Sequence, residues 1–474
     1  MSTALHQSSP PVKPAAPRGL LPVVLTATFM TALDVFVVNV AVPSLQSDLG
    51  AGPAAVQWVV AGFGLAFAAG LVTAGRLGDR YGRRRMFGLG LALFTLASAA
   101  CGLAPTATAL VGARVAQGLA GALMSPQVLA ILRTAYEGAA QARAFARYGL
   151  TMGLGAVLGQ LIGGLLIHAD VLGLGWRSCF LINLPVGLAA LALVRRCLPE
   201  SRAPQRPGLD PAGVLLVTVA LTALVLPLIQ GPGLDWPLWT VLCLAASPAL
   251  LAAFAAHQHR ATGSGGSPLV DTRLFRSRAF STGVLAQLVF MLGQGSFFLV
   301  LALHLQSGRG LDALGAGLVF TAIGLGYLLT SNATHRVTAR LGEPRTITAG
   351  ALVMAAGLLL LALAAYREPT GSTWWLAPGL FVDGIGMGLV IAPVTTVALA
   401  AADPRLAGSA AGVVSTVQQV GGALGVALIG LVYYGADDPT AAFGHSVLAL
   451  AGLELALVAL VRLLPDRHRA APRG

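Results

Sequence analysis

The sequence predicts an all-α, polytopic membrane protein with fourteen transmembrane helices, and three observations support this fold class. Of the 474 residues, 56% are apolar and only 10% are charged, well below the roughly 25% charged residues of soluble domains. Apolar runs long enough to cross a bilayer recur along the whole chain. The positive charges lie in the short segments between those runs, as in membrane proteins of fixed orientation.

The individual helices follow from length, because a spanning helix needs about 20 mostly apolar residues. This rule places helices at residues 20–43, 54–72, 86–103, 108–131, 146–167, 179–195, 210–228, 237–256, 279–305, 313–331, 346–365, 375–399, 407–434 and 443–464.

The arginines predict the orientation of these helices. If the N-terminus lies inside, the inner segments carry 26 of the 30 Lys and Arg residues. The outer links hold only Arg177, Arg309 and Arg367, and Arg114 lies within the fourth helix. This imbalance predicts that both termini face the cytoplasm. The basic residues are spread over eight inner segments, so the net charge of +12 does not indicate a nucleic-acid partner.

A faint internal repeat predicts the domain organisation. His335–Arg345 aligns with Gly75–Arg85 at an offset of 260 residues, and Gln418 with the two glycines that follow it echoes Gln160 at an offset of 258. Both pairs are eight helices apart, which indicates two parallel six-helix halves with helices 7 and 8 inserted between them. The expected parts are a disordered cytoplasmic tail (1–19), an N-terminal half (20–198), the inserted helices with their link (199–260), a cytoplasmic linker (261–278), a C-terminal half (279–464) and a second cytoplasmic tail (465–474).

The segment between helices 2 and 3 reads GRLGDRYGRRR over Gly75–Arg85. So many charges cannot lie in hydrocarbon, which predicts a tight polar hairpin at the membrane surface. The segment resembles the signature of the major facilitator superfamily, G-x-L-x-D-R-x-G-R-R/K. The resemblance implies a gating role for Gly75, Asp79, Arg80, Gly82 and Arg83. We expect Asp79 to approach the donor-rich start of helix 13, at residues 407–409.

Helix 1 carries Asp34 and Asn39 inside LDVFVVNVAVP. A carboxylate within a spanning helix is costly and marks an ion, proton or substrate pathway by default. The stretch resembles the L-D-x-x-V-V-N-V-A-x-P motif of the fourteen-helix drug:proton antiporters, with Phe36 in place of a frequent threonine. The alternative for Asp34 is a structural pair with a buried arginine. For Asn39 it is an interhelical hydrogen bond.

Helix 4 contains Arg114, Gln117 and Gly118, in a pattern that resembles the superfamily's R-x-x-Q-G motif. The resemblance implies that the arginine takes part in proton transfer. Because a guanidinium does not deprotonate in proteins, its physical role would be to tune the protonation of a nearby carboxylate. We therefore assign proton coupling to Asp34 and Arg114, with Gln117 as a further candidate.

Helix 5 presents small residues at four-residue spacing, which predicts one flat face for close helix contact. The run resembles the antiporter motif G-x-x-x-G-P-x-x-G-G, which is associated with exporters. Gln160 stands where the motif has proline. A plain packing face is the alternative interpretation. The residues that align with the motif are Gly155, Gly159, Gly163 and Gly164, with Gln160 at the proline position.

Two acids in the second half have no motif behind them. Asp383 lies in a glycine-rich part of helix 12, and Glu454 lies in helix 14. For Asp383 we consider a proton-binding or substrate-binding role, and for Glu454 a packing role. At 1.5 Å per residue, Asp34, Arg114 and Asp383 would lie at the same depth, which predicts one shared polar cavity in the outer half of the membrane.

The function that these features predict is a proton-coupled antiporter that exports a lipophilic or cationic drug or antibiotic-like compound across the cell membrane. No nucleotide-binding loop, metal-ligand spacing or nucleophile–base pattern is present in the sequence. We therefore expect no enzyme activity and no cofactor beyond the proton-motive force, and we expect a monomer. The alternatives are a proton-coupled importer of a small metabolite, or a membrane receptor or lipid-handling protein that does not transport.

Overall fold

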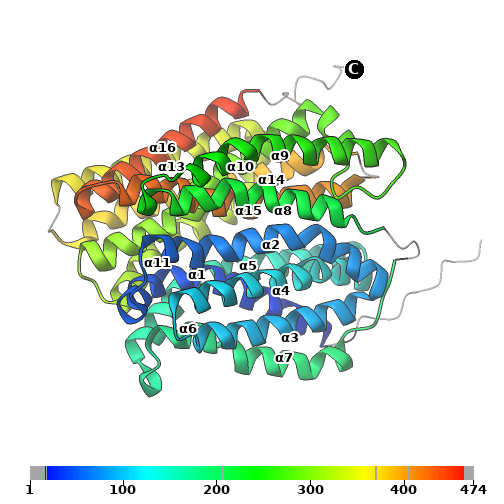
Figure 1. Ribbon diagram of the computed structural model, residues 1–474, viewed down its shortest axis with the longest axis horizontal. Helices are drawn as coiled ribbons and strands as arrows, with labels where there is room; N and C mark the ends of the chain where they lie inside the picture. Colours follow the sequence, from blue (N-terminus) through cyan, green and yellow to red (C-terminus); the bar gives the residue numbers. More distant parts are fainter. Residues whose placement is uncertain (1–16, 18, 204–207, 369–370, 404–405, 464–474) are drawn as a thin grey trace, which may run out of the picture.

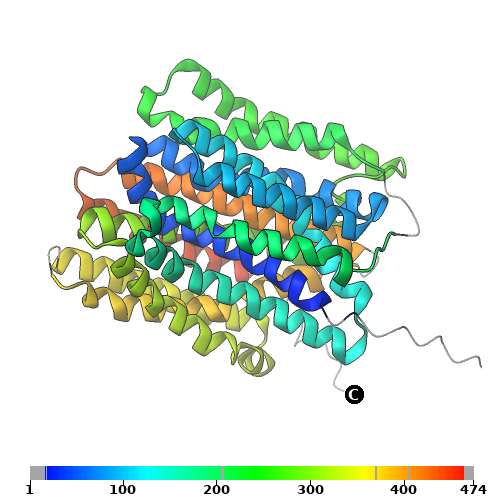
Figure 2. The same ribbon diagram turned by 90° about the horizontal axis from the view of Figure 1, so that it is seen from below.

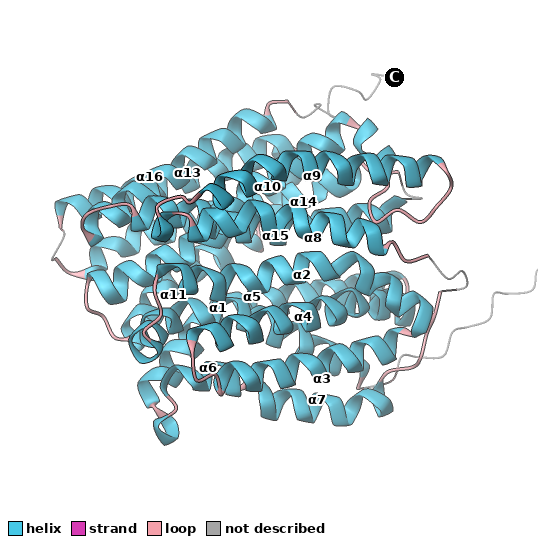
Figure 3. Ribbon diagram, in the orientation of Figure 1, coloured by secondary structure: helices cyan, strands magenta, loops and turns pink. Residues whose placement is uncertain are grey.

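The computed structural model describes residues 17, 19–203, 208–368, 371–403 and 406–463. Within these residues all regular secondary structure is helical (Figure 3), and fourteen helices are long and apolar enough to cross a membrane. The predicted fold class and number of spans are therefore confirmed. The two tails predicted at 1–19 and 465–474 fall almost entirely outside the described residues.

The first six spans run from residue 20 to residue 197. The first five are single helices, and the sixth combines a short 3-10 turn with two helical segments. They are α1 (Leu20–Leu49), α2 (Pro53–Tyr81), α3 (Arg83–Gly102), α4 (Ala107–Ala135), α5 (Gly138–Ala169), and η2 (Gly175–Arg177) with α6 (Ser178–Leu181) and α7 (Asn183–Cys197).

Two spans follow as a separate pair, and six more complete the chain. The pair is α8 (Pro211–Gln230) and α9 (Leu238–Gly263), after which the link contains the 3-10 helix η4 (Thr272–Arg276). The last six are α10 (Arg278–Leu303) with η5 (His304–Gly308), α11 (Ala313–Ser331), α13 (Glu343–Arg367) preceded by the short α12 (Thr334–Leu341), η6 (Thr373–Leu376) with α14 (Ala377–Ala400), α15 (Ala407–Tyr434) and α16 (Pro439–Val461).

The helices are arranged as two bundles that lie side by side. In Figure 1 the blue-to-cyan bundle α1–α7 lies below the green-to-red bundle α10–α16. Contact between the bundles is made mainly by α2 against α15 and by α5 against α11. The pair α8–α9 covers one side of this seam, because α8 packs on both α2 and α15, and Figure 2 shows the pair at one edge of the molecule.

The segment Gly75–Arg85 is not the eleven-residue hairpin that its charges predict. Helix α2 continues through Tyr81 and α3 begins at Arg83, so that Gly82 alone separates them. A helix satisfies its own backbone groups, and it can therefore extend beyond the apolar core while its charged side chains reach water. Gly82 has φ of 113°, a conformation in which glycine meets no Cβ penalty.

The second copy of the repeat has the same construction. Gly342 separates α12 from α13 and has φ of 80°. Gly82 and Gly342 are the residues that the sequence repeat aligns, 260 positions apart. The repeat is thus a repeat of local geometry: a helix end, one glycine in a left-handed conformation, and a new helix.

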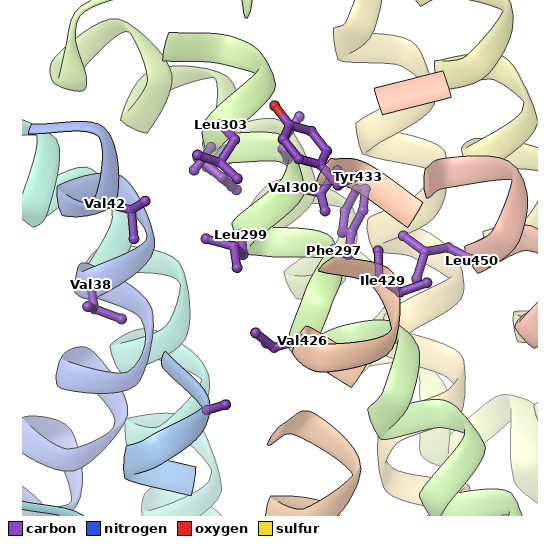
Figure 4. Packing of buried hydrophobic residues seen from close by; sticks show 14 of the residues in the cluster. Val38, Val42, Phe297, Leu299, Val300, Leu303, Val426, Ile429, Tyr433 and Leu450 are labelled. Atoms are coloured by element: carbon purple, nitrogen blue, oxygen red, sulfur yellow. The ribbon is translucent and has the colours of Figure 1, made fainter. Parts of the chain in front are cut away.

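An apolar layer lies between the bundles where α1 meets α10. In Figure 4, Val38 and Val42 of α1 face the helix that carries Leu299 and Leu303. All four side chains are buried and belong to one hydrophobic cluster. Hydrophobic contact therefore seals this part of the seam, close to the buried polar residues of α1.

Candidate functional site

The centre of the α1–α7 bundle holds a charged pair that is wholly buried. Asp34 of α1 is 0% exposed and Arg114 of α4 is 1% exposed. Nη1 of Arg114 lies 2.5 Å from Oδ2 of Asp34. Gln117, one helical turn after Arg114, donates from Nε2 to Oδ1 of Asp34 at 2.7 Å, and Asn183 of α7 donates to the same oxygen at 3.3 Å. Both carboxylate oxygens of Asp34 therefore have donors.

Arg114 is held in place from several directions. Its Nε donates to the backbone oxygen of Val59 on α2 at 2.9 Å, and its Nη1 also donates to Oε1 of Gln117 at 2.8 Å. The guanidinium carbon lies 4.4 Å from the ring centre of Phe63 and 5.7 Å from that of Phe180. Aromatic faces stabilise a desolvated cation. The Arg114 side chain is thus held against Asp34 by contacts from α2, α4 and α6.

The glycines of α5 bring that helix unusually close to α1. A Cβ placed on Gly155 would lie 2.6 Å from Cβ of Ala32, and one on Gly163 would lie 2.7 Å from Cγ2 of Val37. Gly159 occupies the turn between them, beside Leu33 and Phe36. The glycine face predicted from the sequence therefore packs directly on the turn of α1 that carries Asp34.

The remaining two residues of the α5 run face the other bundle. A Cβ on Gly164 would lie 2.4 Å from the backbone oxygen of Ala313 on α11, and the backbone oxygen of Gln160 lies against Gly317. The side-chain amide of Gln160 is buried without a hydrogen-bond partner. Helix α5 therefore contacts α1 within its own bundle and α11 across the seam.

Phe36 and Asn39 of α1 have different surroundings. The Phe36 ring meets Phe298 of α10 edge-on at 5.1 Å, and Phe298 stacks on Phe320 of α11 at 6.0 Å. The Asn39 amide donates to the backbone oxygens of Val35 and Phe36 within its own helix. Phe36 therefore connects the two bundles through aromatic contacts, whereas Asn39 makes its described hydrogen bonds locally.

The charged segment Gly75–Arg85 lies at the end of α2 opposite to Val59, which contacts Arg114. Asp79 accepts a hydrogen bond at 2.8 Å from Arg83, the first residue of α3. Arg80 lies over the ring of Tyr81, and a Cβ added to Gly75 would lie 3.8 Å from Cβ of Pro126. The expected approach of Asp79 to residues 407–409 stays a prediction, and neighbouring residues 404–405 lie outside the described part of the chain.

An acid that the sequence did not single out occupies the start of α3. Glu200 Oε1 accepts from the backbone N–H of Arg84 at 3.1 Å, and its other oxygen lies 3.7 Å from both Arg84 and Arg85. A Cβ on Gly82 would collide with this carboxylate at 2.6 Å. Gly82 therefore serves two purposes, since it turns the chain and leaves room for Glu200 at a helix N-terminus.

Asp383 and Glu454 do not join the Asp34 cluster. Asp383 of α14 and Glu454 of α16 belong to the other bundle and are 1% and 2% exposed. Among the described residues, the hydrogen-bond donors to Asp34 all come from its own bundle. The described hydrogen bonds therefore join Asp34 to Arg114 but not to Asp383, and the expected cavity shared by all three stays a prediction.

Asn183 and Ser98 complete the Asp34 site, and sequence reasoning did not assign them. Asn183 donates to Ser98 at 2.9 Å, and Ser98 donates to the backbone oxygen of Phe180. The available signal was a polar side chain within an apolar helix, which in a membrane indicates a partner. No group of three or more His, Cys, Asp or Glu side chains within the described residues could hold a metal ion.

Comparison with known proteins finds relatives over most of the chain. The family model described as Major Facilitator Superfamily matches residues 24–426, with a second, overlapping match over 283–474. The protein named "Probable actinorhodin transporter" of Streptomyces coelicolor is 41% identical over 88% of this chain and 72% of its own. The puromycin resistance protein pur8 of Streptomyces alboniger is 37% identical, with 90% and 86% covered. The tetracenomycin C resistance and export protein of Streptomyces glaucescens is 34% identical, with 91% and 80% covered.

Solved structures give the same fold at much lower identity. A POT family transporter crystallised with a thioalcohol-conjugated peptide superimposes with a TM-score of 0.71 at 16% identity, covering 95% of this chain and 99% of the other. That likeness shows the fold alone, and the family follows from the sequence matches. The chain belongs to the major facilitator superfamily and, within it, to the drug-efflux proteins.

Proposed function

We propose that this protein exports a lipophilic or cationic antibiotic-like compound across the cell membrane in exchange for protons. The observation that carries the proposal is the wholly buried Asp34, whose charge is balanced by one arginine that cannot release a proton. The names of the relatives, which include resistance and export proteins, support the direction of transport.

In this mechanism Asp34 is the proton carrier. When Asp34 accepts a proton it loses its charge, and its attraction to Arg114 falls accordingly. Gln117 can then turn its amide toward Arg114 alone, which it already contacts. The contacts with Val59 and the aromatic rings keep Arg114 in place. The weaker attraction therefore allows α1, the helix that carries Asp34, to move relative to α4.

A movement of α1 would affect both bundles, because α1 contacts helices of each. It packs on α5 through Gly155, Gly159 and Gly163, and on α10 through Phe36. Both α5 and α10 line the seam between the bundles. Protonation of Asp34 would therefore bias the contact between bundles, which is the element that opens and closes in alternating access.

The proposed location and orientation in the membrane follow from the composition and the number of spans. The excess of arginine in the inner segments favours cytoplasmic termini in a cell membrane. The fourteen candidate spans among the described residues, an even number, support placing both ends on one side. We propose a monomer driven by the proton-motive force, with Asn39 as a polar contact on the substrate side of α1.

The test is proton movement in inverted membrane vesicles that contain the full chain. Ethidium, a fluorescent lipophilic cation, and puromycin serve as probe substrates. Addition of either should release lumenal protons in vesicles with the wild-type protein, and Asp34→Asn should abolish this release for both. Asp48→Asn, which alters an acid at the outer end of the same helix, is the matched control and should keep the release. Proton release that survives Asp34→Asn would overturn the assignment.

A further inference from the structure

The two links that flank the inserted pair α8–α9 meet at one arginine of α2. Nη1 of Arg76 donates to the backbone oxygen of Gly208 at 2.9 Å, in the link before α8, and to that of Ser267 at 2.8 Å, in the link after α9. Its Nη2 donates to the backbone oxygen of Pro268. The links also contact each other, because the Gly208 N–H donates to Oγ of Ser267 at 3.2 Å. One guanidinium of the first bundle thus holds the base of the inserted pair.

The link after α9 is also attached to the second bundle. The Asp271 N–H donates to Oγ of Ser409, in the first turn of α15, at 3.4 Å. Leu274 is buried in a hydrophobic cluster with Phe280 of α10 and Val413 of α15. The chain then enters α10 at residue 278. From Asp271 onward the link is therefore held by the second bundle.

The same link is bonded to the end of α9. The N–H of Val270 donates to Oε1 of Gln258 at 3.1 Å, and the N–H of Thr272 donates to Oγ1 of Thr262 at 3.4 Å. These bonds make the link and the inserted pair one unit. That unit is fastened to α2 on one side and to α10 and α15 on the other.

Little chain is available between the two attachments. Pro268 is bonded to Arg76, and Asp271, three residues later, is bonded to Ser409. Three residues span at most about 11 Å when fully extended. A separation of the bundles at this end would therefore tighten the link and pull its carbonyl groups away from Arg76.

Helices α2 and α15 are in contact beside this link. A Cβ on Gly412 of α15 would lie 3.6 Å from Cγ2 of Val72, which precedes Arg76 by one turn of α2. Every hydrogen bond described between the link and α2 comes from Arg76. Bonds from an ionised donor are stronger than bonds between neutral groups. Arg76 therefore fastens the link to α2 where the seam is closed.

The internal repeat offers a comparison for Arg76. This residue occupies an unspecified position of the signature G-x-L-x-D-R-x-G-R-R/K and aligns with Arg336 of α12, 260 residues later. Arg336 is exposed, and among the described side-chain hydrogen bonds none is made by it. The inserted pair follows the first half of the chain, and its two links supply the acceptors that distinguish Arg76 from its copy.

We propose that Arg76 is a latch, which fastens the link of the inserted pair to α2 and so holds closed the end of the seam that the proposed orientation places inside. With the latch closed, the link joins α2 to α15 and α10. When the bundles separate at this end, the carbonyl groups of Ser267 and Pro268 leave Arg76, and water takes their place. The inserted pair thereby acts on the balance between open and closed states.

The test measures the distance between the two bundles at this end by electron paramagnetic resonance, on the full chain in lipid nanodiscs. Spin labels at Ala142→Cys in α5 and Ala339→Cys in α12 occupy exposed positions of different bundles. Cys197→Ser and Cys243→Ser remove the two cysteines that are not fully buried. Arg76→Gln should raise the ratio of long to short distances by about three- to tenfold, as expected for the loss of about one net hydrogen bond.

Two further variants separate the geometry of the latch from its charge. Arg336→Gln removes a cation from the repeated position and should leave the ratio unchanged. Arg76→Lys keeps the charge but has no planar fork for separate carbonyl groups, so it should raise the ratio less than Arg76→Gln does. It also provides a reading if Arg76→Gln does not fold. A wild-type ratio in both Arg76 variants, or an equal rise in Arg336→Gln, would overturn the proposal.

Hydrogen–deuterium exchange gives a second measurement on the same variants. The N–H groups of Gly208 and Val270 should exchange faster in Arg76→Gln, because the two links lose their common partner. Faster exchange with an unchanged distance ratio would show that Arg76 holds only the base of the inserted pair, and it would overturn the latch.

The latch goes beyond the proposed export function, because it depends on the movement of the bundles and not on the transported compound or on protons. The distance measurement needs no substrate. A wild-type protein that exchanges no protons would refute antiport, and the distance ratios would still decide whether Arg76 holds this end of the seam closed.

Discussion

Arg114 and Asp34 are 80 residues apart in the sequence, yet their charged groups meet at 2.5 Å in the centre of the first bundle. Both side chains are almost completely shielded from solvent. Such a pair contributes less to stability than its short distance implies, because both ions lose their hydration. Removing one partner lowers the stability strongly, because the other ion is then left buried and unpaired.

The first prediction follows from this asymmetry. Arg114→Gln should lower the free energy of unfolding by about 3–5 kcal/mol, because Asp34 then lacks its counter-ion. Asp34→Asn/Arg114→Gln should recover most of this loss. Denaturant unfolding in detergent, arranged as a double-mutant cycle, measures both effects. The control is Arg177→Gln, which breaks the partly exposed pair with Asp48 and should cost about 1 kcal/mol or less.

A second prediction concerns the close contact between α5 and α1. Gly155→Ala should destabilise the protein by about 1–3 kcal/mol, since its Cβ would meet that of Ala32 at 2.6 Å. Gly149→Ala on the same helix is the matched control. Apart from its chain neighbours and the nearby backbone of its own helix, no atom lies within 4 Å of its added Cβ, and alanine is the better helix former by up to about 1 kcal/mol. The midpoint temperature of thermal unfolding should fall in Gly155→Ala and rise in Gly149→Ala. Equal shifts in the two variants would contradict the packing argument.

A third prediction concerns Asp79, for which we propose a gating role. Asp79→Asn should keep expression and membrane insertion but slow transport of ethidium, because the carboxylate is proposed to approach the start of α15 when the inner side closes. A carboxylate at a helix N-terminus contributes about 0.3–1 kcal/mol. A disulfide between Asp79→Cys and Ser409→Cys should form in one state of the cycle. Failure to form it in every state would refute the approach.

A fourth prediction concerns the end of the seam that the proposed orientation places outside. His168 at the end of α5 lies 2.9 Å from Asp312 at the start of α11, and Gln306 donates to the backbone oxygen of Val40 at 3.0 Å. These contacts join the bundles beside a pocket of about 390 Å³ lined in part by Ser44. His168→Asn should therefore increase the fraction of molecules in which this end of the seam is open.

The size of that effect is limited by exposure, since both side chains of the pair are more than half exposed. Exposed pairs contribute about 0.2–1 kcal/mol, which corresponds to a change of up to about fivefold in the ratio of open to closed states. The rate at which Ser44→Cys reacts with a water-soluble maleimide measures this ratio. An unchanged rate would show that the pair does not hold the outer end closed.

The sequence by itself determined the fold class, the number of spans and the family. Each of these depends on local properties: the length of apolar runs, the distribution of arginine, and short motifs. The membrane makes these local signals decisive, because every apolar run of about 20 residues must become a helix whose backbone groups bond to one another. The glycine face of α5 was also predictable, since its spacing is a property of one helix.

Only the tertiary structure decided which buried polar groups meet. Depth along a helix placed Asp34, Arg114 and Asp383 at one level, but only the packing of α1 on α4 shows that the side chains of Asp34 and Arg114 meet. The donor Asn183 and the acid Glu200 were missed because their partners are distant in sequence. A hydrogen bond requires a donor–acceptor distance correct to a few tenths of an ångström and a suitable angle. The packing of the helices sets both, and the sequence of a single apolar run contains no information about that packing.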